Sequence, residues 1–224
     1  MANKYKSSID RAKIYVNELA SRKENFDLIN SDFDKIWQIE KKYLLSPISS
    51  GLVFVNQHRA HFRILFDQFN DAFNNKPIPG QILLFPEKIN IDSHKKVILL
   101  DILPYLERIG FKLKEYPDGG LVITSIPVDV VWGSEKKLIN FLIDEFQNLR
   151  ETSLSVEQVI SILLSKKIAI KENDILELSQ MREVLNRLFS SSDPYYSPEG
   201  KKIIYFNKIT DIDDQFYERN EKNN

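Results

Sequence analysis

One short polar stretch, Asn56-Gln57-His58-Arg59-Ala60-His61, contains two of the three histidines of the chain. Imidazole nitrogens bind transition metals and exchange protons near neutral pH, so this stretch is the first candidate for a metal site or an acid-base site. The structural alternative is that both histidines hold the start of a helix by hydrogen bonds. The choice depends on the elements that present these side chains.

The polar stretch joins a predicted strand to a predicted helix. Before it, the uninterrupted apolar run Leu52-Val53-Phe54-Val55 is typical of a strand buried on both faces. After it, apolar residues recur at helical spacing from about 57 to 74, and we expect them to form core: Phe62, Leu65, Phe66, Phe69 and Phe73. A helix that begins where a strand ends points free backbone N–H groups toward polar side chains that can converge on a ligand.

Three segments, in order, resemble the C-terminal dimerisation domain of the mismatch-repair protein MutL. Residues 55–67 resemble a segment that in the family's nicking members runs DQHA, two residues, Glu, four residues, Glu. Gln81-Ile82-Leu83-Leu84-Phe85-Pro86 is similar to its sliding-clamp contact, and Ser197-Pro198-Glu199-Gly200-Lys201 stands where nicking members have CPHGR. The resemblance extends over about residues 32 to 218.

The resemblance also locates the family's endonuclease ligands, most of which are replaced here. The family's Asp falls on Asn56 and its His on His58, with Gln57 between them. Its two Glu fall on Phe62 and Asp67, its Ala-Cys-Arg on Ser165-Lys166-Lys167, its second Cys on Ser197 and its later His on Glu199. An amide, a phenyl ring and an ammonium group cannot replace carboxylate and thiolate ligands. We therefore predict no nicking activity, no catalytic residue and no metal site.

Two alternatives stay open. His58, Asp67 and Glu199 could rebuild a weaker metal site, which would make the chain a metal-dependent nicking endonuclease with a substituted ligand set. A stand-alone interaction domain unrelated to repair is the other alternative. We interpret Arg59 and Arg63 as a solvated face of the helix, with DNA contact as the second interpretation.

The segment from Gln81 to Pro86 is short and apolar and ends in proline. Because proline cannot donate to a ladder, the pattern predicts an edge strand. The resemblance implies that Gln81, Leu84 and Pro86 bind a sliding clamp, with the strand in an apolar groove and Gln81 bonding at its mouth. The alternative is an ordinary edge strand.

The composition limits the classes of function. The 224 residues, 42% of them hydrophobic and 28% charged, suffice for one or two compact units. A formal charge of −1 gives no basic surplus, so we expect DNA contact to be weak or to come from a longer protein. With no cysteine there is no disulfide and no thiolate metal site. With no signal peptide and no long apolar run either, we expect a cytoplasmic protein without membrane contact.

The order of elements predicts an α/β, more narrowly α+β, fold with two subdomains. By resemblance, residues 32–88 and 166–218 form a sheet-and-helix dimerisation subdomain, and residues 89–165 form a smaller inserted external, regulatory subdomain. Residues 1–31 are predicted to be a linker remnant with a possible helix, and 219–224 a disordered tail. The resemblance implies a homodimer that joins two ATPase arms and contacts a MutS-like protein.

Individual elements follow from local patterns. A first strand with one wet face is predicted from Trp37 to Leu45, antiparallel to the next. Further predictions are a helix from Asp92 to Gly110 kinked or broken at Pro104, a hairpin turn at residues 117–120, helices capped by Ser134 and Ser155, a helix from Leu178 to Phe189, a strand from Ile203 to Phe206 and a last helix capped by Thr210. No glycine-rich nucleotide loop appears, so no cofactor is assigned here. By resemblance, ATP and Mg belong to an upstream domain, and we expect this chain to be the C-terminal fragment of a longer protein.

Overall fold

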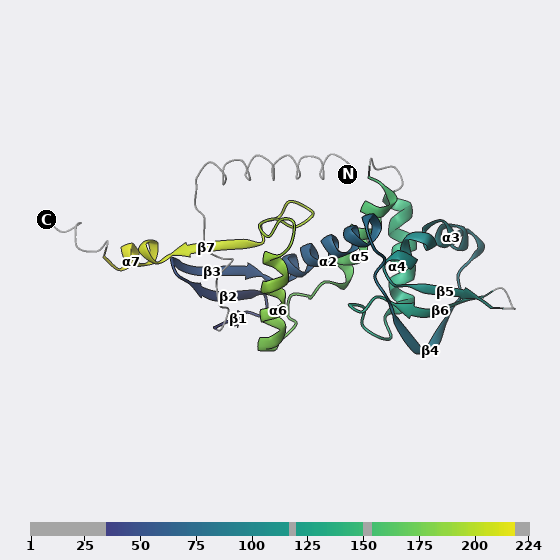
Figure 1. The fold of residues 1–224 in the computed structure, drawn as a ribbon, viewed down its shortest axis with the longest axis horizontal. Coiled ribbons are helices and arrows are strands. Elements are labelled where there is room, and N and C mark those ends of the chain that lie inside the picture. Colours follow the sequence, from purple (N-terminus) through teal and green to yellow (C-terminus); the bar gives the residue numbers. More distant parts are fainter. Residues whose placement is uncertain (1–34, 117–119, 150–153, 218–224) are drawn as a thin grey trace. The chain divides into compact units, whose positions relative to one another are not determined.

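The structure, a computed structural model, describes residues 35–116, 120–149 and 154–217 (Figure 1). Within them the chain forms two compact units, one made of the residues up to Ile64 and from Ala169 onward, the other of Leu65–Ile168. Each unit has its own antiparallel sheet and helices, so the predicted α+β fold is confirmed. The expected linker 1–31 and tail 219–224 lie outside the described residues, and the subdomain boundaries after residues 88 and 165 remain an expectation from the resemblance.

A four-stranded sheet in the order β1-β2-β3-β7 forms the first unit. The strands are β1 (Trp37–Ile39), β2 (Tyr43–Ile48), β3 (Gly51–Asn56) and β7 (Ile204–Lys208). The predicted single strand from Trp37 to Leu45 is wrong. Glu40 and Lys41 adopt positive φ angles of 51° and 47°, which turn the chain back so that Trp37 pairs with Leu45. The predicted antiparallel pairing of β2 with β3 is confirmed.

Two helices bury one face of this sheet. They are α2 (Gln57–Asn74) and α6 (Leu178–Phe189), and both begin and end where the apolar periodicity predicted. Their apolar residues join those of the strands in one core: Leu44, Val53, Val55, Ala60, Ile64, Met181, Val184, Leu185, Leu188 and Ile204. Because side chains alternate along a strand, the residues between these core positions face the opposite side of the sheet.

The last described helix, α7 (Ile209–Tyr217), directly follows β7 and has no buried residue. It begins one residue before Thr210, which was predicted as its cap, and the Ile209 backbone N–H donates to the carbonyl of Ser50 at 3.0 Å. Among the described helices, none combines the length and the hydropathy needed to cross a membrane.

The second unit contains a three-stranded antiparallel sheet in the order β4-β6-β5. β4 (Gln81–Ile89) is an edge strand, as its proline predicted. β5 (Lys112–Glu115) and β6 (Leu121–Ile126) form the predicted hairpin, whose turn residues 117–119 lie outside the described residues.

Three further helices belong to the second unit: α3 (Ser93–Arg108), α4 (Glu135–Leu149) and α5 (Val156–Ile168). Asp92 caps α3 by accepting from the Lys95 backbone N–H at 2.8 Å, and the helix passes Pro104 without the break that we considered. The predicted capping box of α5 is confirmed, since Ser155 and Gln158 each accept the other's backbone N–H. Ser134 precedes α4, but its hydroxyl donates back to the Val131 carbonyl.

Candidate functional site

The side chain of Asn56 caps α2. Asn56 is the last residue of β3 and is buried, and its Oδ1 accepts from the Arg59 backbone N–H at 2.9 Å. Asparagine is among the best residues for this position because its oxygen satisfies an N–H that has no partner within the helix. The residue in the place of the family's Asp is thus bonded to its own helix.

Gln57 is completely buried and connects α2 to a distant segment, residues 170–176. Its Nε2 donates to the carbonyls of Lys171 at 2.8 Å and Asp174 at 3.2 Å. Its Oε1 accepts from Gln38 Nε2 at 2.7 Å, and Gln38 also bonds Asp174 and Leu176. No local pattern in the sequence indicates the role of Gln38, whereas the Asn173-Asp174 pair is a turn signal that locates this segment.

Both histidines of the polar stretch bond the backbone of one residue, Ile170. The His58 Nδ1 lies 2.8 Å from the carbonyl oxygen of Ile170, so this nitrogen carries the proton and donates it. The Ile170 N–H donates to the His61 Nδ1 at 3.0 Å, so that nitrogen carries none. These bonds match the structural interpretation of the two histidines, because they fix the start of α2 against residue 170.

The prediction of a solvated arginine face on α2 is wrong for Arg63, whereas Arg59 is partly exposed. Arg63 is buried and its Nε donates to the Tyr196 carbonyl at 2.8 Å, while Arg59 Nη1 donates to the Lys202 carbonyl at 2.7 Å. Both acceptors belong to the irregular segment that leads into β7. A guanidinium can satisfy such carbonyls with its several donors, a long-range use that helical periodicity does not reveal.

The segment in the place of CPHGR is a closed turn. Ser197 is buried, its backbone N–H donates to the Lys201 carbonyl at 2.9 Å, and its hydroxyl accepts from the Lys201 N–H at 3.2 Å. Glu199 lies 3.4 Å from the Lys201 ammonium, which balances its charge. Just before the turn, burial and the carboxylate of Asp193 both raise the pKa of the Tyr195 phenol.

Asp67 and Lys166 belong to the second unit, whereas the other candidates of the endonuclease motif belong to the first: Asn56, Gln57, His58, Ser197 and Glu199. Asp67 follows His58 by nine residues on α2, which at about 100° per residue places it on the opposite side of the helix. Lys166 is exposed in the last turn of α5, where a cation is favourable beside the free carbonyls of a helix end.

The candidate residues do not fit a catalytic metal site. In the described ranges 35–116, 120–149 and 154–217, no three His, Asp or Glu side chains are grouped so that they could hold an ion. In the first unit the candidate donors are an amide, a hydroxyl, one histidine and one carboxylate paired with a lysine. Divalent ions that hydrolyse phosphodiesters require several carboxylates or imidazoles.

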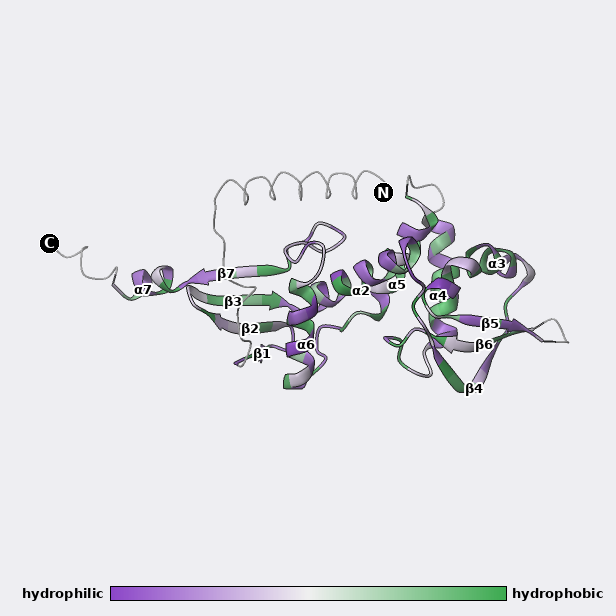
Figure 2. Ribbon diagram, in the orientation of Figure 1, coloured by the Kyte–Doolittle hydropathy of each residue, from purple (hydrophilic) through white to green (hydrophobic). Residues whose placement is uncertain are grey.

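Two of the three clamp-like residues, Leu84 and Pro86, lie in a bulge of β4. Gln81 and Ile82 pair with β6, and so do Glu87, Lys88 and Ile89, but the register shifts between the two groups. The intervening residues leave the ladder, so that Leu84 is 75% and Phe85 89% exposed, Pro86 is also exposed and Leu83 is buried. Figure 2 shows this apolar first half of β4 and its hydrophilic second half.

A groove of about 380 Å³ adjoins this bulge. Leu83 to Glu87 line one part of it, and Trp132, Gly133 and Glu135 line the other. Gln81 does not line the groove. It is half-buried, and its Nε2 donates to the carbonyls of Pro127 at 3.3 Å and Val130 at 3.2 Å.

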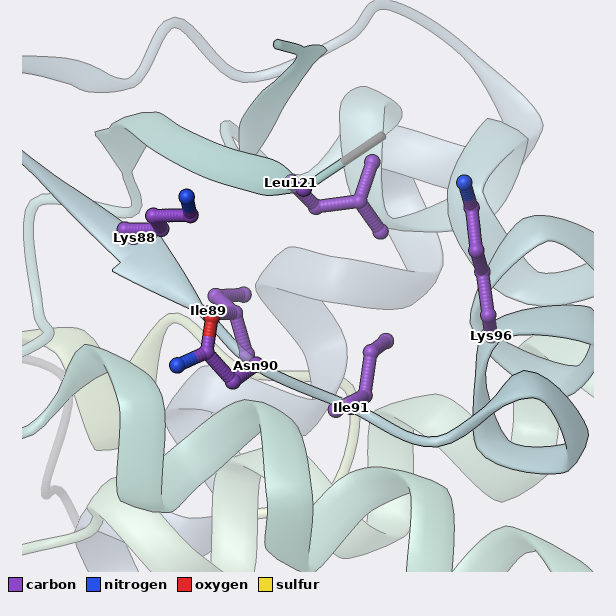
Figure 3. Close-up of a pocket in the computed structure, with 7 residues that line it drawn as sticks. Lys88, Ile89, Asn90, Ile91, Lys96 and Leu121 are labelled. Atoms are coloured by element: carbon purple, nitrogen blue, oxygen red, sulfur yellow. The ribbon is translucent and has the colours of Figure 1, made fainter. Parts of the chain in front are cut away.

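A second hollow, of about 220 Å³, lies at the far end of β4. Lys88 and Lys96 stand at opposite ends of it, with Ile91 and Leu121 between them (Figure 3). Lys96 donates to the Glu115 carboxylate at 2.7 Å, a bond that lowers the pKa of Glu115. Because this ammonium already pairs with a carboxylate, we assign no ligand to the hollow.

Two comparisons with known proteins identify the family of this chain. A family model described as the MutL C terminal dimerisation domain matches residues 36–176. The DNA mismatch repair protein MutL of Chlorobium phaeobacteroides (strain BS1) is 33% identical over 183 residues, which cover 81% of this chain and 29% of that protein. The MutL of Flavobacterium johnsoniae is 33% identical over 200 residues, 89% of this chain and 31% of that protein.

The chain thus spans about a third of the length of these curated relatives. The family match covers more than half of the chain and includes the polar stretch and the β4 bulge. On this evidence, the chain belongs to the MutL family of DNA mismatch repair proteins and corresponds to its C-terminal dimerisation domain.

Proposed function

We propose that the chain is the homodimerisation module of a MutL-like mismatch repair protein, that it joins two ATPase arms, and that it has no nicking activity of its own. The supporting observation is a row of apolar side chains across the open face of the first sheet. The strand register aligns Trp37 with Leu45, Leu45 with Phe54 and Phe54 with Tyr205.

This row lies opposite the buried face of the same sheet. Trp37 is 51% exposed, Tyr205 is also exposed, and Leu45 and Phe54 are half-buried. The rings of Phe54 and Tyr205 lie 6.1 Å apart and form one continuous aromatic surface. An apolar row of this kind favours a symmetric interface, in which the same surface of two copies packs face to face.

Sedimentation equilibrium of the unmodified chain tests the proposal. At micromolar concentration we expect twice the mass of one chain. A single-chain mass throughout this range would reject the homodimer.

The absence of nicking is proposed from the ligand set. Asn56 caps a helix, His58 bonds the Ile170 carbonyl and Glu199 pairs with Lys201. Incubation of supercoiled plasmid with the chain and manganese should therefore leave the plasmid closed. Nicking that is lost in both His58→Ala and Glu199→Ala would instead indicate a rebuilt metal site, which is the alternative function.

We further propose that the β4 bulge binds a sliding clamp. The exposure of Leu84 and Pro86 beside an apolar groove supports this contact. Leu84→Ala should weaken binding to a clamp immobilised for surface plasmon resonance, and an unmodified chain that does not bind would reject the contact. A MutS-like protein is a further partner in this proposal. We expect DNA contact by this chain alone to be weak, because the net charge of −1 gives it no basic surplus.

A further inference from the structure

The loop between β6 and α4, residues 127–134, presents apolar side chains to solvent. Val131 is 76% exposed, Trp132 is 57% exposed, and Val128 is exposed as well. Isolated apolar residues on a surface are common and need no explanation. Here, however, Trp132 of the loop and the exposed Leu84 and Phe85 of the bulge border the same groove, so that these three side chains form one apolar patch, and such patches mark interaction sites.

Hydrogen bonds hold the backbone of this loop. The Val130 N–H donates to the Pro127 carbonyl at 3.1 Å, and the Ser134 N–H donates to the Val131 carbonyl at 3.3 Å. The Gly133 N–H donates to the buried Glu135 carboxylate at 3.0 Å. A partner that binds this loop therefore meets a conformation that is already formed, which lowers the entropic cost of binding.

Gln81 connects the loop to β4. Its two bonds, to the carbonyls of Pro127 and Val130, use an amide group that has two N–H donors. Both carbonyls precede the exposed Val131 and Trp132 in the chain. The Gln81 amide thus bonds backbone carbonyls of the loop and does not line the groove.

We propose that residues 127–134 form the second half of the clamp-binding surface and that Gln81 is a positioning residue for them. The inference rests on the proposed clamp contact of the β4 bulge. Because Trp132 and the bulge line one groove, a clamp side chain that enters the groove contacts both. Tryptophan is among the residues that contribute most to such interfaces.

The first test measures binding of the 224-residue chain to the sliding clamp of the same organism by surface plasmon resonance. Trp132→Ala should weaken binding by about tenfold or more. Tyr116→Ala is the matched control, an aromatic residue of the same unit that is 56% exposed, and should change the affinity less than about twofold.

A second test separates positioning from direct contact. The chain has two tryptophans, so Trp37→Phe leaves Trp132 as the only one. In this background and without clamp, Gln81→Ala should shift the emission of Trp132 and lower its anisotropy, whereas the exposed Gln215→Ala should change neither. The same Gln81→Ala variant should also bind the clamp more weakly.

Three results would overturn the inference. Trp132→Ala with unchanged affinity, while Leu84→Ala abolishes binding, would leave the clamp contact intact and exclude the loop. Loss of binding in Gln81→Ala without any change in Trp132 fluorescence would make Gln81 a direct clamp contact. No binding by the unmodified chain would reject the clamp contact and the inference with it.

Discussion

Polar groups at the start of α2 and apolar groups at the edge of the second sheet are used in opposite ways. Asn56, Gln57 and His58 have the residue types of a chemical site, yet each has a hydrogen-bond partner within the fold. Leu84, Phe85 and Trp132 have no chemistry of that kind, and all three are exposed beside a groove.

The difference indicates where function resides in this chain. A metal site needs several lone pairs that converge on one ion, and among the described residues no three His, Asp or Glu side chains are grouped in that way. Burial of an exposed apolar side chain lowers the free energy, so a partner that covers it binds more tightly. We therefore expect substitutions at the start of α2 to change stability and substitutions on the exposed apolar surfaces to change association.

Phe62→Glu should produce the largest loss of stability. Phe62 stands where the family's nicking members have a carboxylate, but here it is buried. Removing the ring and burying a charge should lower the free energy of unfolding by about 4 kcal/mol or more, whereas Phe62→Leu should cost about 1 kcal/mol. Urea unfolding measures both values. Equal stability of Phe62→Glu and the unmodified chain would show that position 62 tolerates a carboxylate. The start of α2 would then be able to hold a metal ligand, contrary to the contrast with the β4 bulge.

Gln57→Ala should have the next largest effect. It removes the amide that bonds the Lys171 and Asp174 carbonyls and leaves Gln38 without one of its partners. Unsatisfied buried groups cost about 1–3 kcal/mol each, so we expect a loss of about 3 kcal/mol. Thermal unfolding provides the measurement, with the exposed Gln215→Ala as control. At a temperature where the variant is folded, the affinity of Gln57→Ala for the clamp should match that of the unmodified chain. A large loss of affinity would show that the start of α2 and the β4 bulge are energetically coupled.

Asn56 should show the smallest effect. Asn56→Ala removes the helix cap and should cost about 1 kcal/mol, while Asn56→Asp retains a capping oxygen and should change stability by less than about 0.5 kcal/mol. Asn56→Asp also restores the family's carboxylate, and the plasmid assay should still show no nicking. If that single change produced nicking, the other ligands would have to be present, contrary to the ligand argument.

Local features of this fold could be predicted from the sequence. The bounds of α2 and α6, the capping box of α5 and the edge position of β4 depend on residues close together in the chain. Helical spacing, a Ser-x-x-Gln pair and a proline are enough to identify them.

Features that depend on distant residues could not be predicted in this way. Gln57 and Lys171 are 114 positions apart, and Arg63 and Tyr196 are 133 apart. No local pattern shows that an arginine on a helix will be buried against such a carbonyl. The hairpin between β1 and β2 was missed for another reason. Trp37, Ile39, Tyr43 and Leu45 keep an even spacing on both sides of Glu40 and Lys41, whose positive φ angles no glycine or proline signals.

In the proposed function, an apolar surface of the first sheet is the dimer interface of this chain. Sedimentation equilibrium of the unmodified chain, Phe54→Glu and the control Val97→Glu tests it most directly, since Val97 is an exposed apolar residue of the other unit. We expect dimers for the unmodified chain and Val97→Glu, and monomers for Phe54→Glu with an unchanged circular dichroism spectrum. An unmodified chain that is monomeric at micromolar concentration, or a Phe54→Glu dimer of unchanged dissociation constant, would contradict this proposal.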